Sequence, residues 1–185
     1  MKKLTINLNR ISLDEAYMQM AEIWAKRSKA NRLQVGGLLV LGNQIISDGY
    51  NGMPAGYEGD DEVCEEYTEE PVRNGPFVIT TKPEVLHAEA NMLLKVAANG
   101  GPGTMGATMY VTHSPCPYCA KLIIQAKLAR VVYRNKYRLT EGLQMLEKRG
   151  IICDHLTAVE EKPLPACLCD KKASKCGNPT CYVMS

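Results

Sequence analysis

The chain has 185 residues, of which 45% are hydrophobic, and a formal net charge of +2 from 22 basic and 20 acidic residues. This length suits one domain with a core and is too short for two ordinary ones, and the near-balanced charge gives no reason to expect a nucleic-acid polymer as partner. No apolar run approaches the roughly 18 to 20 residues of a membrane span, and the N-terminal MKKLTINLNR lacks the apolar stretch of a signal peptide.

The first predicted element is a helix that runs from Leu13 to about Ala30. Ser12-Leu13-Asp14-Glu15 has the form of a capping box, in which Ser12 caps the backbone of the first turn. Apolar residues then recur at helical spacing, and we interpret this stripe as core packing. Its members are Leu13, Tyr17, Met20, Ile23 and Trp24.

A hairpin follows. Residues 34–41 and 44–50 flank the dipeptide Gly42-Asn43, which is typical of a tight turn between antiparallel strands. Both strands are apolar enough to be central in a sheet. The next segment, residues 49–76, is rich in glycine, proline and acidic residues, which argues against regular structure over most of its length.

The remainder alternates between helices and strands. We expect helices over residues 87–98, from Cys116 onward, and over 140–148, the last capped by Thr140. Strands are expected over residues 108–112, 131–133 and 151–156. Strands separated by helices imply a partly parallel sheet, so the predicted fold is α/β: a three-layer α/β/α sandwich with a mixed, roughly five-stranded sheet. We expect one domain over residues 1–160 and a cysteine-rich tail over residues 161–185.

Two short motifs carry the chemistry. The first is His87-Ala88-Glu89, and the second, which begins 26 residues after Glu89, is Pro115-Cys116-Pro117-Tyr118-Cys119. Separately, the Cys-x-x-Cys pair is compatible with a redox pair or half of a structural zinc knuckle, and the histidine with a core residue. Together they supply one imidazole, two thiolates and a carboxylate, whereas a structural zinc site is more often closed by four ligands.

Three protein ligands leave one position of a tetrahedral zinc for water, and zinc brings the pKa of that water to about 7. His-x-Glu with Pro-Cys-x-x-Cys is the signature of zinc deaminases, in which the glutamate moves protons and does not bind the metal. Glu89 would therefore protonate N3 of an aminopyrimidine and later the leaving amine. The carbonyl of Ser114 is placed to accept from the exocyclic amine. His113 ends a strand beside the site, and we expect no chemical role for it.

These motifs resemble the cytidine deaminase superfamily. GYNGMPAG at residues 49–56 and SPCPYCAKLIIQAKLARVVY at residues 114–133 narrow the resemblance to the deoxycytidylate (dCMP) deaminases. It covers roughly residues 12–155. It implies a cytidine deaminase-like fold and hydrolysis of dCMP to dUMP and ammonia, which feeds thymidylate synthesis.

The resemblance also implies roles for single residues. His87, Cys116 and Cys119 match the zinc ligands of the family, and Glu89 matches its proton shuttle. Three further residues match positions around the substrate, although a local structural explanation is open for each. Asn51 matches a contact to sugar and phosphate or serves a left-handed turn, Tyr137 matches an aromatic wall or simply packs, and Arg32 lies near the substrate phosphate or caps an exposed loop.

Regulation is implied in the same way. Members of this family are hexamers that dCTP with Mg²⁺ activates and dTTP inhibits, with the effector near Gly49, Gly52 and Gly56. Turns that need glycine explain these residues equally well. Asp60 and Asp61 are candidates to assist Mg²⁺, or belong to a solvated acidic loop. The chain departs from the family at Arg138, where an acidic residue is common, and in the late position of Cys64.

The tail holds four cysteines that can bind a second, structural zinc or remain unpaired thiols. They are Cys167, Cys169, Cys176 and Cys181. Cysteines used as metal thiolates favour a reducing compartment, and we expect the cytoplasm. Two other functions stay open: deamination of another aminated base, such as dCTP, cytidine or adenosine in tRNA, and a zinc-containing nucleotide sensor without catalysis.

Overall fold

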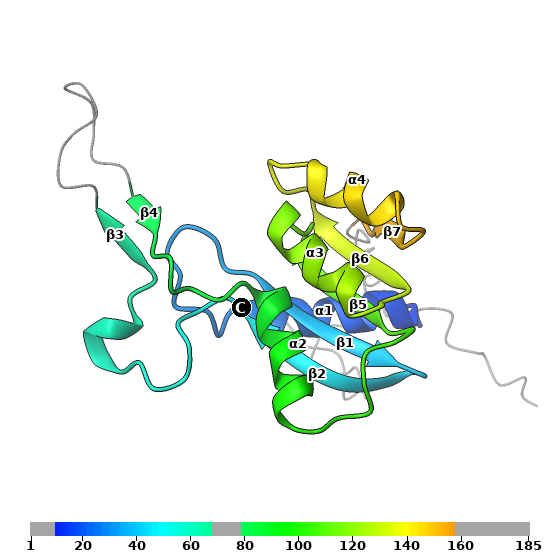
Figure 1. The fold of residues 1–185 in the computed structure, drawn as a ribbon, viewed down its shortest axis with the longest axis horizontal. Coiled ribbons are helices and arrows are strands. Elements are labelled where there is room, and N and C mark those ends of the chain that lie inside the picture. The colour runs from blue at the N-terminus through cyan, green and yellow to red at the C-terminus, as the bar shows by residue number, and fades with distance from the viewer. Residues whose placement is uncertain (1–9, 68–78, 158–185) are drawn as a thin grey trace, which may run out of the picture.

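The computed structural model describes residues 10–67 and 79–157, without the side chains of residues 60, 61 and 67 (Figure 1). The helices are α1 (Leu13–Ala25), α2 (Ala88–Ala98), α3 (Pro117–Gln125) and α4 (Glu141–Glu147), with a short 3₁₀ helix, η1 (Gly59–Glu62). The strands are β1 (Gly36–Leu41), β2 (Gln44–Tyr50), β3 (Glu65–Tyr67), β4 (Ile79–Thr81), β5 (Thr108–His113), β6 (Arg130–Asn135) and β7 (Ile152–His155). None of the helices in this part of the chain is long and apolar enough to cross a membrane.

Five strands form one mixed sheet in the order β2-β1-β5-β6-β7. β1 is antiparallel to both β2 and β5, whereas β5, β6 and β7 are parallel to one another. The parallel half follows from its connections, because α3 joins β5 to β6 and α4 joins β6 to β7. The prediction of an α/β fold with a mixed five-stranded sheet is confirmed.

Helices cover both faces of the sheet (Figure 1). On one face, Met18 and Ala21 of α1 pack on Leu38, Tyr110 and Val132. The other face is covered by α2 and α3, with α4 beside α3, and its buried residues alternate along the strands with those that face α1. This core contains Leu39, Met109, Val111, Val131 and Tyr133 of the strands with Met92, Val96, Ala120, Ile123 and Leu146 of the helices. The arrangement is the predicted three-layer sandwich.

The first helix begins where the sequence predicts and ends earlier. Ser12 accepts a hydrogen bond from the backbone N–H of Glu15 at 3.1 Å, as expected of its cap. The helix ends at Ala25, and the interpretation of its apolar stripe was wrong for three members. Leu13, Met20 and Ile23 are exposed, while Met18, Ala21 and Ala25 are buried. Close approach of α1 to the sheet explains this choice, because a Cβ on Gly36 would overlap the backbone of α1.

The hairpin is confirmed in its register and turn. Leu41 pairs with Gln44, and Gly42 and Asn43 both have positive φ, 55° and 65°, which is typical of a two-residue hairpin turn. The prediction that both strands are central was wrong for β2, which forms the edge of the sheet as described. Its buried residues Ser47 and Gly49 alternate with partly buried ones, and α2 packs against it more extensively than α1 does.

The segment after β2 carries more structure than the sequence predicts. Besides η1, it contains β3, which pairs with β4 in a separate two-stranded sheet beside the main domain (Figure 1). The carboxylate of Glu65 in β3 accepts from the backbone N–H groups of Asn31 and Arg32 at 2.9 and 3.1 Å. These bonds fix the small sheet to the loop between α1 and β1.

Candidate active site

The first candidate motif lies at the start of α2. A two-residue bridge between Gly52 and Leu86 holds the chain extended up to His87. His87 is the N-cap, with φ −71° and ψ 153°, and its side chain makes no capping hydrogen bond. Glu89 lies in the first turn and is buried, with 5% of its surface exposed. The imidazole is therefore free to turn outward, while the carboxylate points into the protein.

The second motif lies at the start of α3. Cys116 is the N-cap and Pro117 occupies the first turn, where the lack of an N–H group costs no helical hydrogen bond. Cys119 follows in the same turn and is fully buried. The positive end of a helix dipole stabilises thiolates at these positions. Both helix starts were predicted, one residue before their observed bounds.

The two helix starts bring three metal-binding groups together. One donor atom each from His87, Cys116 and Cys119 lies within 4.8 Å of the others. The Nδ1 atom of His87 is 3.6 Å from Sγ of Cys116 and 3.4 Å from Sγ of Cys119. Nδ1 is therefore the histidine atom that faces both sulfurs. One imidazole and two thiolates around a common point suit zinc, and a fourth position stays open to the cavity.

The electrostatics of the cluster support this fit. A hydrogen bond from the Cys119 thiol, with another from His87, lowers the pKa of Cys116 to about 3. The same bond to Cys116, together with burial, raises the pKa of Cys119. Two bare thiolates this close together would repel each other. A divalent cation removes that repulsion and binds both as thiolates, so the donor set fits a metal.

Glu89 lies beside this cluster without belonging to it. Burial raises the pKa of its carboxyl group above the ordinary value. A carboxyl group with a raised pKa exchanges protons more readily near neutral pH than an ordinary glutamate does. The sequence motif and the structure therefore place the same group next to the metal donors, with the properties of a proton shuttle.

A cavity of about 530 Å³ opens onto these groups. It collects residues from six separate parts of the chain, and all substrate positions expected from the sequence lie in its wall. Those residues are Arg32, Asn51, Ser114 and Tyr137, together with His87, Glu89 and Cys116. Its other lining residues are Ala30, Leu33, Val35, Glu65, Thr81, Val85, Ala88, His113 and Arg138.

Asn51 is held by the backbone of the preceding loop. Its Oδ1 accepts from the N–H of Val35 at 2.7 Å, and its Nδ2 donates to the carbonyl of Leu33 at 2.8 Å. The left-handed turn that we considered is not observed, since Asn51 is not among the described residues with positive φ. Asn51 therefore shapes the cavity wall, and the second hydrogen of Nδ2 is available for a ligand.

Ser114 and Tyr137 are joined across the site. The hydroxyl of Ser114 accepts from the N–H of Tyr137 at 2.8 Å, and the N–H of Ser114 donates to the carbonyl of Asn135 at 2.8 Å. Ser114 is buried, with 3% of its surface exposed. These bonds fix the backbone directly before Pro115. The Ser114 carbonyl in this segment is the group that the sequence analysis predicts to accept from the exocyclic amine.

Two arginines line the cavity. Arg32 is exposed on the wall, and its guanidinium donates to the hydroxyl of Thr81 at 3.4 Å. Arg138 lies on the same cavity, 5.8 Å from the ring centre of Tyr137. The sequence analysis identified Arg138 only as a position where the chain departs from the family. Nothing in its local pattern indicated that it lines the site.

The three glycines proposed for effector binding differ from one another. Gly49 packs against α2, where a Cβ would lie 2.8 Å from Cγ of Met92. Gly52 forms the bridge to Leu86, and Gly56 has a positive φ of 98° with open space around it. None of them lines the cavity. The side chains of Asp60 and Asp61 and the four tail cysteines lie outside the described part of the chain.

Two further lining residues that the sequence analysis did not expect at the site come from the small sheet. Glu65 and Thr81 belong to β3 and β4, and the irregular composition of that segment gave no signal for either strand. His113 was expected beside the site without a chemical role, and it lines the cavity. Its position directly before Ser114 was the available signal.

Comparison with known proteins agrees with this geometry. The model of the cytidine and deoxycytidylate deaminase zinc-binding region matches residues 11–135. The chain belongs to this family. The resemblance to dCMP deaminases that the motifs indicated is thereby confirmed, and the matched region of this deaminase family contains all three metal donors and Glu89.

Two curated proteins are similar to this chain in sequence. It is 34% identical over 151 residues to ComE operon protein 2 of Bacillus subtilis, covering 80% of this chain and 74% of that protein. It is also 34% identical over 149 residues to the deoxycytidylate deaminase of Enterobacteria phage T2, covering 65% of this chain and 78% of that protein.

A solved structure is similar over most of the fold. The dCMP deaminase from cyanophage S-TIM5, in complex with dCMP and dUMP, superposes with a TM-score of 0.67 and 36% identity. The match covers 80% of this chain and 100% of that one.

Proposed function

We propose that this protein is a zinc-dependent enzyme that converts dCMP and water to dUMP and ammonia. The observation that carries the proposal is Glu89, a buried carboxyl group beside three metal donors in the wall of a nucleotide-sized cavity. The similarity to a phage dCMP deaminase that binds dCMP and dUMP supports the choice of substrate.

His87 through Nδ1 and the sulfurs of Cys116 and Cys119 would hold the metal. When bound, zinc would lower the pKa of water from near 16 to about 7 and so supply a nucleophile at neutral pH. The full burial of Cys119 would shield the metal from solvent on that side.

Glu89 moves the protons. Its carboxylate takes a proton from the attacking water and delivers it to N3 of the cytosine ring, which makes C4 electrophilic. It then takes the proton of the hydroxyl group that C4 has gained and passes it to the exocyclic nitrogen, so that the C–N bond breaks, ammonia leaves and C4 becomes a carbonyl. Each such role contributes roughly 100- to 10,000-fold in rate. The raised pKa of Glu89 suits a group that must both accept and donate.

The base is oriented by the backbone before Pro115. The Ser114 carbonyl accepts from the exocyclic amine and disfavours a uracil, whose 4-carbonyl has no hydrogen to donate. The bonds from Ser114 to Asn135 and Tyr137 hold this carbonyl in place. Tyr137 forms the aromatic wall against which a base can stack.

We place the phosphate beside a cationic side chain of the cavity wall. Arg32 lies on the cavity wall with its backbone N–H bonded to Glu65, so the side chain projects from a fixed loop. A guanidinium donates two parallel hydrogen bonds to phosphate oxygens. Asn51, which is fixed between Leu33 and Val35, contacts the sugar and phosphate side of the nucleotide.

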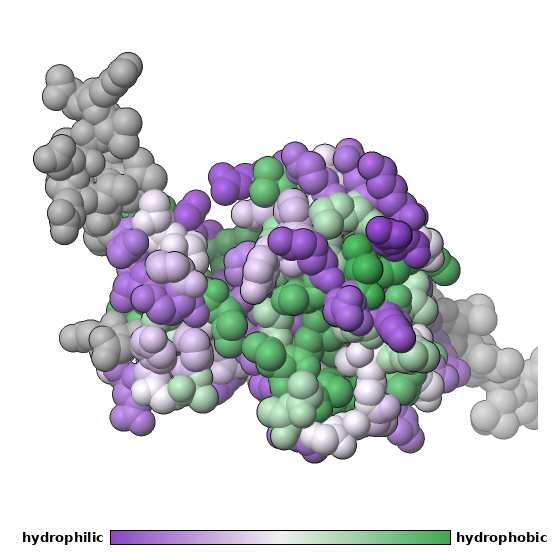
Figure 2. Space-filling view, in the orientation of Figure 1, coloured by the Kyte–Doolittle hydropathy of each residue, from purple (hydrophilic) through white to green (hydrophobic). Residues whose placement is uncertain are grey.

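We further propose the regulation and assembly that are typical of the family. dCTP with Mg²⁺ activates, dTTP inhibits, and the effector lies near Gly49, Gly52 and Gly56 in a homohexamer. Figure 2 shows apolar side chains gathered over α2 and α3, where Leu94 is 54% exposed, which supports contact with other subunits. The product dUMP supplies thymidylate synthesis in the cytoplasm.

The test is the loss of cytosine absorbance when zinc-loaded protein is mixed separately with dCMP, cytidine or dCTP. We expect turnover of dCMP alone among the three, and stimulation of it by dCTP with Mg²⁺. Glu89→Gln should retain zinc and lose at least about 100-fold in turnover. If dCMP is inert while another base is consumed, the substrate assignment is wrong and the zinc chemistry stands. If nothing is consumed and nucleotides still bind, the protein is a sensor.

A further inference from the structure

His113 is the cavity residue to which the proposed mechanism gives no task. It ends β5, one residue before Ser114, and its ring lies in the wall of the same cavity as Glu89. Its ring is also tied to the interior of the protein. The direction of that tie decides which ring nitrogen carries a hydrogen, and hence what the ring offers to a ligand.

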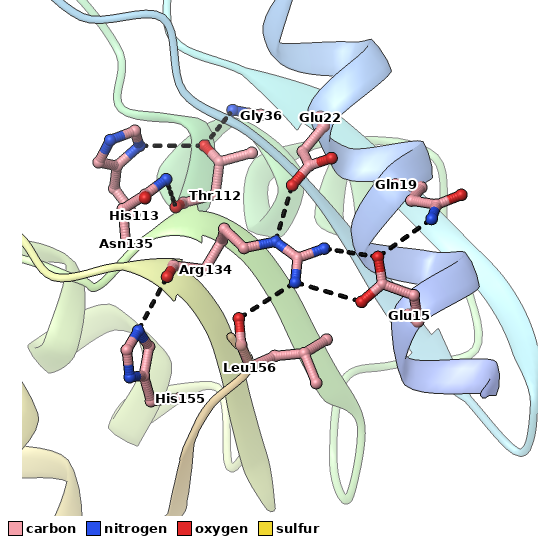
Figure 3. A network of polar contacts seen from close by, with 10 residues as sticks. All are labelled: Glu15, Gln19, Glu22, Gly36, Thr112, His113, Arg134, Asn135, His155 and Leu156. Atoms are coloured by element: carbon pink, nitrogen blue, oxygen red, sulfur yellow. Dashed lines mark hydrogen bonds and ion pairs between the residues drawn. The ribbon is translucent and has the colours of Figure 1, made fainter. Parts of the chain in front are cut away.

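A chain of two hydrogen bonds leads from β1 to this ring (Figure 3). The backbone N–H of Gly36 donates to Oγ1 of Thr112 at 3.2 Å, and the same Oγ1 lies 3.2 Å from Nδ1 of His113. Thr112 is buried, with 4% of its surface exposed. Its carbonyl is held by Nδ2 of Asn135 at 3.0 Å, so neighbouring strands fix this residue from both sides.

The hydroxyl hydrogen of Thr112 has one acceptor among the described residues, namely Nδ1 of His113. A backbone N–H can only donate, so Gly36 cannot receive that hydrogen. If Nδ1 carried the ring hydrogen, the buried hydroxyl hydrogen would be left without a partner, which is costly. Nδ1 therefore accepts, and the neutral ring carries its hydrogen on Nε2.

The other ring nitrogen, Nε2, lies away from Thr112. Figure 3 shows the second ring nitrogen of His113 on the far edge of the ring from Thr112. In the described part of the chain, Nε2 has no protein partner. Burial lowers the pKa of His113, which keeps the ring neutral. His113, which lines the cavity, thus carries one N–H donor that no protein group uses in the described part of the chain.

We propose that His113 is a specificity-determining residue whose Nε2–H donates a hydrogen bond to an oxygen of the nucleotide substrate. Thr112 is the positioning residue that keeps the hydrogen on Nε2. The proposal rests on the proposed deamination of a nucleotide. The acceptor belongs to the base, the sugar or the phosphate, all of which offer oxygens to such a donor, whereas the reacting amine offers hydrogens and is excluded.

Steady-state kinetics of zinc-loaded variants test the contact. His113→Phe keeps a ring of similar shape without the donor, and we expect a loss of roughly 5- to 100-fold in kcat/KM for dCMP with zinc content unchanged. His113→Gln, which keeps an N–H donor, should recover part of that loss. Thr112→Val should lower kcat/KM by roughly 3- to 10-fold. Thr112→Ser should recover what Thr112→Val loses.

Parallel assays with deoxycytidine identify the acceptor. A loss in His113→Phe for dCMP and not for deoxycytidine assigns the bond to the phosphate, and an equal loss for both assigns it to the base or sugar. If wild-type protein turns over dCMP and His113→Phe stays within about twofold of it, the inference about His113 is overturned and the proposed function stands. If wild-type protein does not turn over dCMP, both fail.

A spectroscopic measurement tests the positioning step without relying on activity. The chain has 3 histidines, so ¹⁵N–¹H spectra of the imidazole rings assign His113 by its absence in His113→Phe. We expect the Nε2–H tautomer in the wild-type protein and a mixture of tautomers in Thr112→Val. An Nδ1–H tautomer in the wild-type protein would overturn the proposal, whatever the kinetics show.

Discussion

Two polar clusters occupy opposite sides of the sheet, and they differ in what completes them. On the α1 side, the guanidinium of Arg134 donates to both carboxylate oxygens of Glu15, at 2.8 and 3.2 Å. It also donates to Glu22 at 2.8 Å and to the carbonyl of Leu156 at 3.1 Å (Figure 3). Arg134 and Glu15 are 9% and 5% exposed. The chain supplies both signs of charge, and the cluster is complete without a ligand.

The cluster at the starts of α2 and α3 is built in the opposite way. His87, Cys116 and Cys119 direct three donors of electron pairs at one another, and Glu89 adds a carboxyl group beside them. No lysine or arginine of the chain pairs with these groups in the described residues. A cation must come from outside. The chain itself neutralises the charge of the cluster on the α1 side, so that cluster stabilises the fold. The donors at the starts of α2 and α3 have no cation from the chain, and such an arrangement marks the site where chemistry takes place.

The largest expected effect comes from removing one metal donor. Cys116→Ala should lose zinc and bring kcat for dCMP below about one thousandth of wild type, because the pKa of the attacking water returns from about 7 toward 16. Metal analysis together with the absorbance assay measures both quantities. Cys153→Ala is the matched control, since this half-buried thiol of β7 lies outside the donor cluster. Equal zinc loss in both variants would contradict the assignment of the ligands.

The next largest effect is on stability. Arg134→Met leaves the carboxylate of Glu15 buried without a cation, and we expect a loss of about 3 to 5 kcal/mol in the free energy of unfolding. Arg130 is the natural comparison, because it also bridges α1 to the sheet through Asp14 and Asp154 but is 28% exposed. Arg130→Met should cost about 1 kcal/mol. Urea unfolding at pH 7 measures the free energy of unfolding of both variants. Equal losses would show that burial does not determine how much these ion pairs stabilise the protein.

The two clusters were not equally visible in the sequence. The metal donors are local, since each half lies within five residues and begins a helix, so spacing alone indicated His87, Glu89, Cys116 and Cys119. The pair between Glu15 and Arg134 joins residues 119 positions apart. Hydrophobic periodicity does not predict a contact between residues that are so far apart in the chain. Glu15 was interpreted only as part of a capping box, although its carboxylate serves Arg134.

The strands and helices were predictable for a similar reason, because hydrophobic periodicity and turn residues act over short distances. What failed depends on distance in space. Leu13, Met20 and Ile23 have the spacing of a buried face, but close packing at Gly36 selects the small residues of α1 instead. The sequence analysis did not predict the short strand β3. Its Glu65 anchors the loop at Arg32, and a contact between residues this far apart in the chain leaves no local pattern. Only the folded structure brings these residues together.

Gly142 in α4 offers a third test, of intermediate size. A Cβ at this position would overlap the carbonyl of Pro115, directly before the ligand Cys116. Alanine normally stabilises a helix relative to glycine by about 1 kcal/mol. Gly142→Ala should instead destabilise the protein by about 1 to 3 kcal/mol, because the overlap must be relieved by moving backbone.

The same displacement should weaken zinc binding, since Cys116 moves with Pro115. A competition titration with a chelator measures it. Glu141→Ala, the neighbouring helical position on the exposed side, is the control and should leave zinc affinity unchanged. If Gly142→Ala stabilises the protein, α4 does not pack tightly against the backbone of Pro115 and Cys116.

The smallest effect is the pH dependence of the Asp14 pair. Hydrogen bonds from Arg130, and from the hydroxyl of Tyr110, lower the pKa of Asp14 below its ordinary value of 3.8. A carboxyl group whose pKa is lowered by folding contributes its stability in full above the ordinary value and loses it as the pH falls through the folded value. Asp14→Asn should therefore be less stable than wild type by about 1 kcal/mol at pH 7, and this difference should narrow below pH 3.8.

Urea unfolding of both proteins at pH 7, 5 and 3 measures that difference, and the comparison is internal. Protonation of the thiolates and of His87 in acid releases the metal from both proteins alike, so its effect cancels between them. A difference that stays constant into acid would mean that Asp14 stabilises α1 by shape and neutral hydrogen bonds. The α1 side would then owe its stability to packing around Arg130, and only the deeper pair of Arg134 and Glu15 would represent charge completed within the chain.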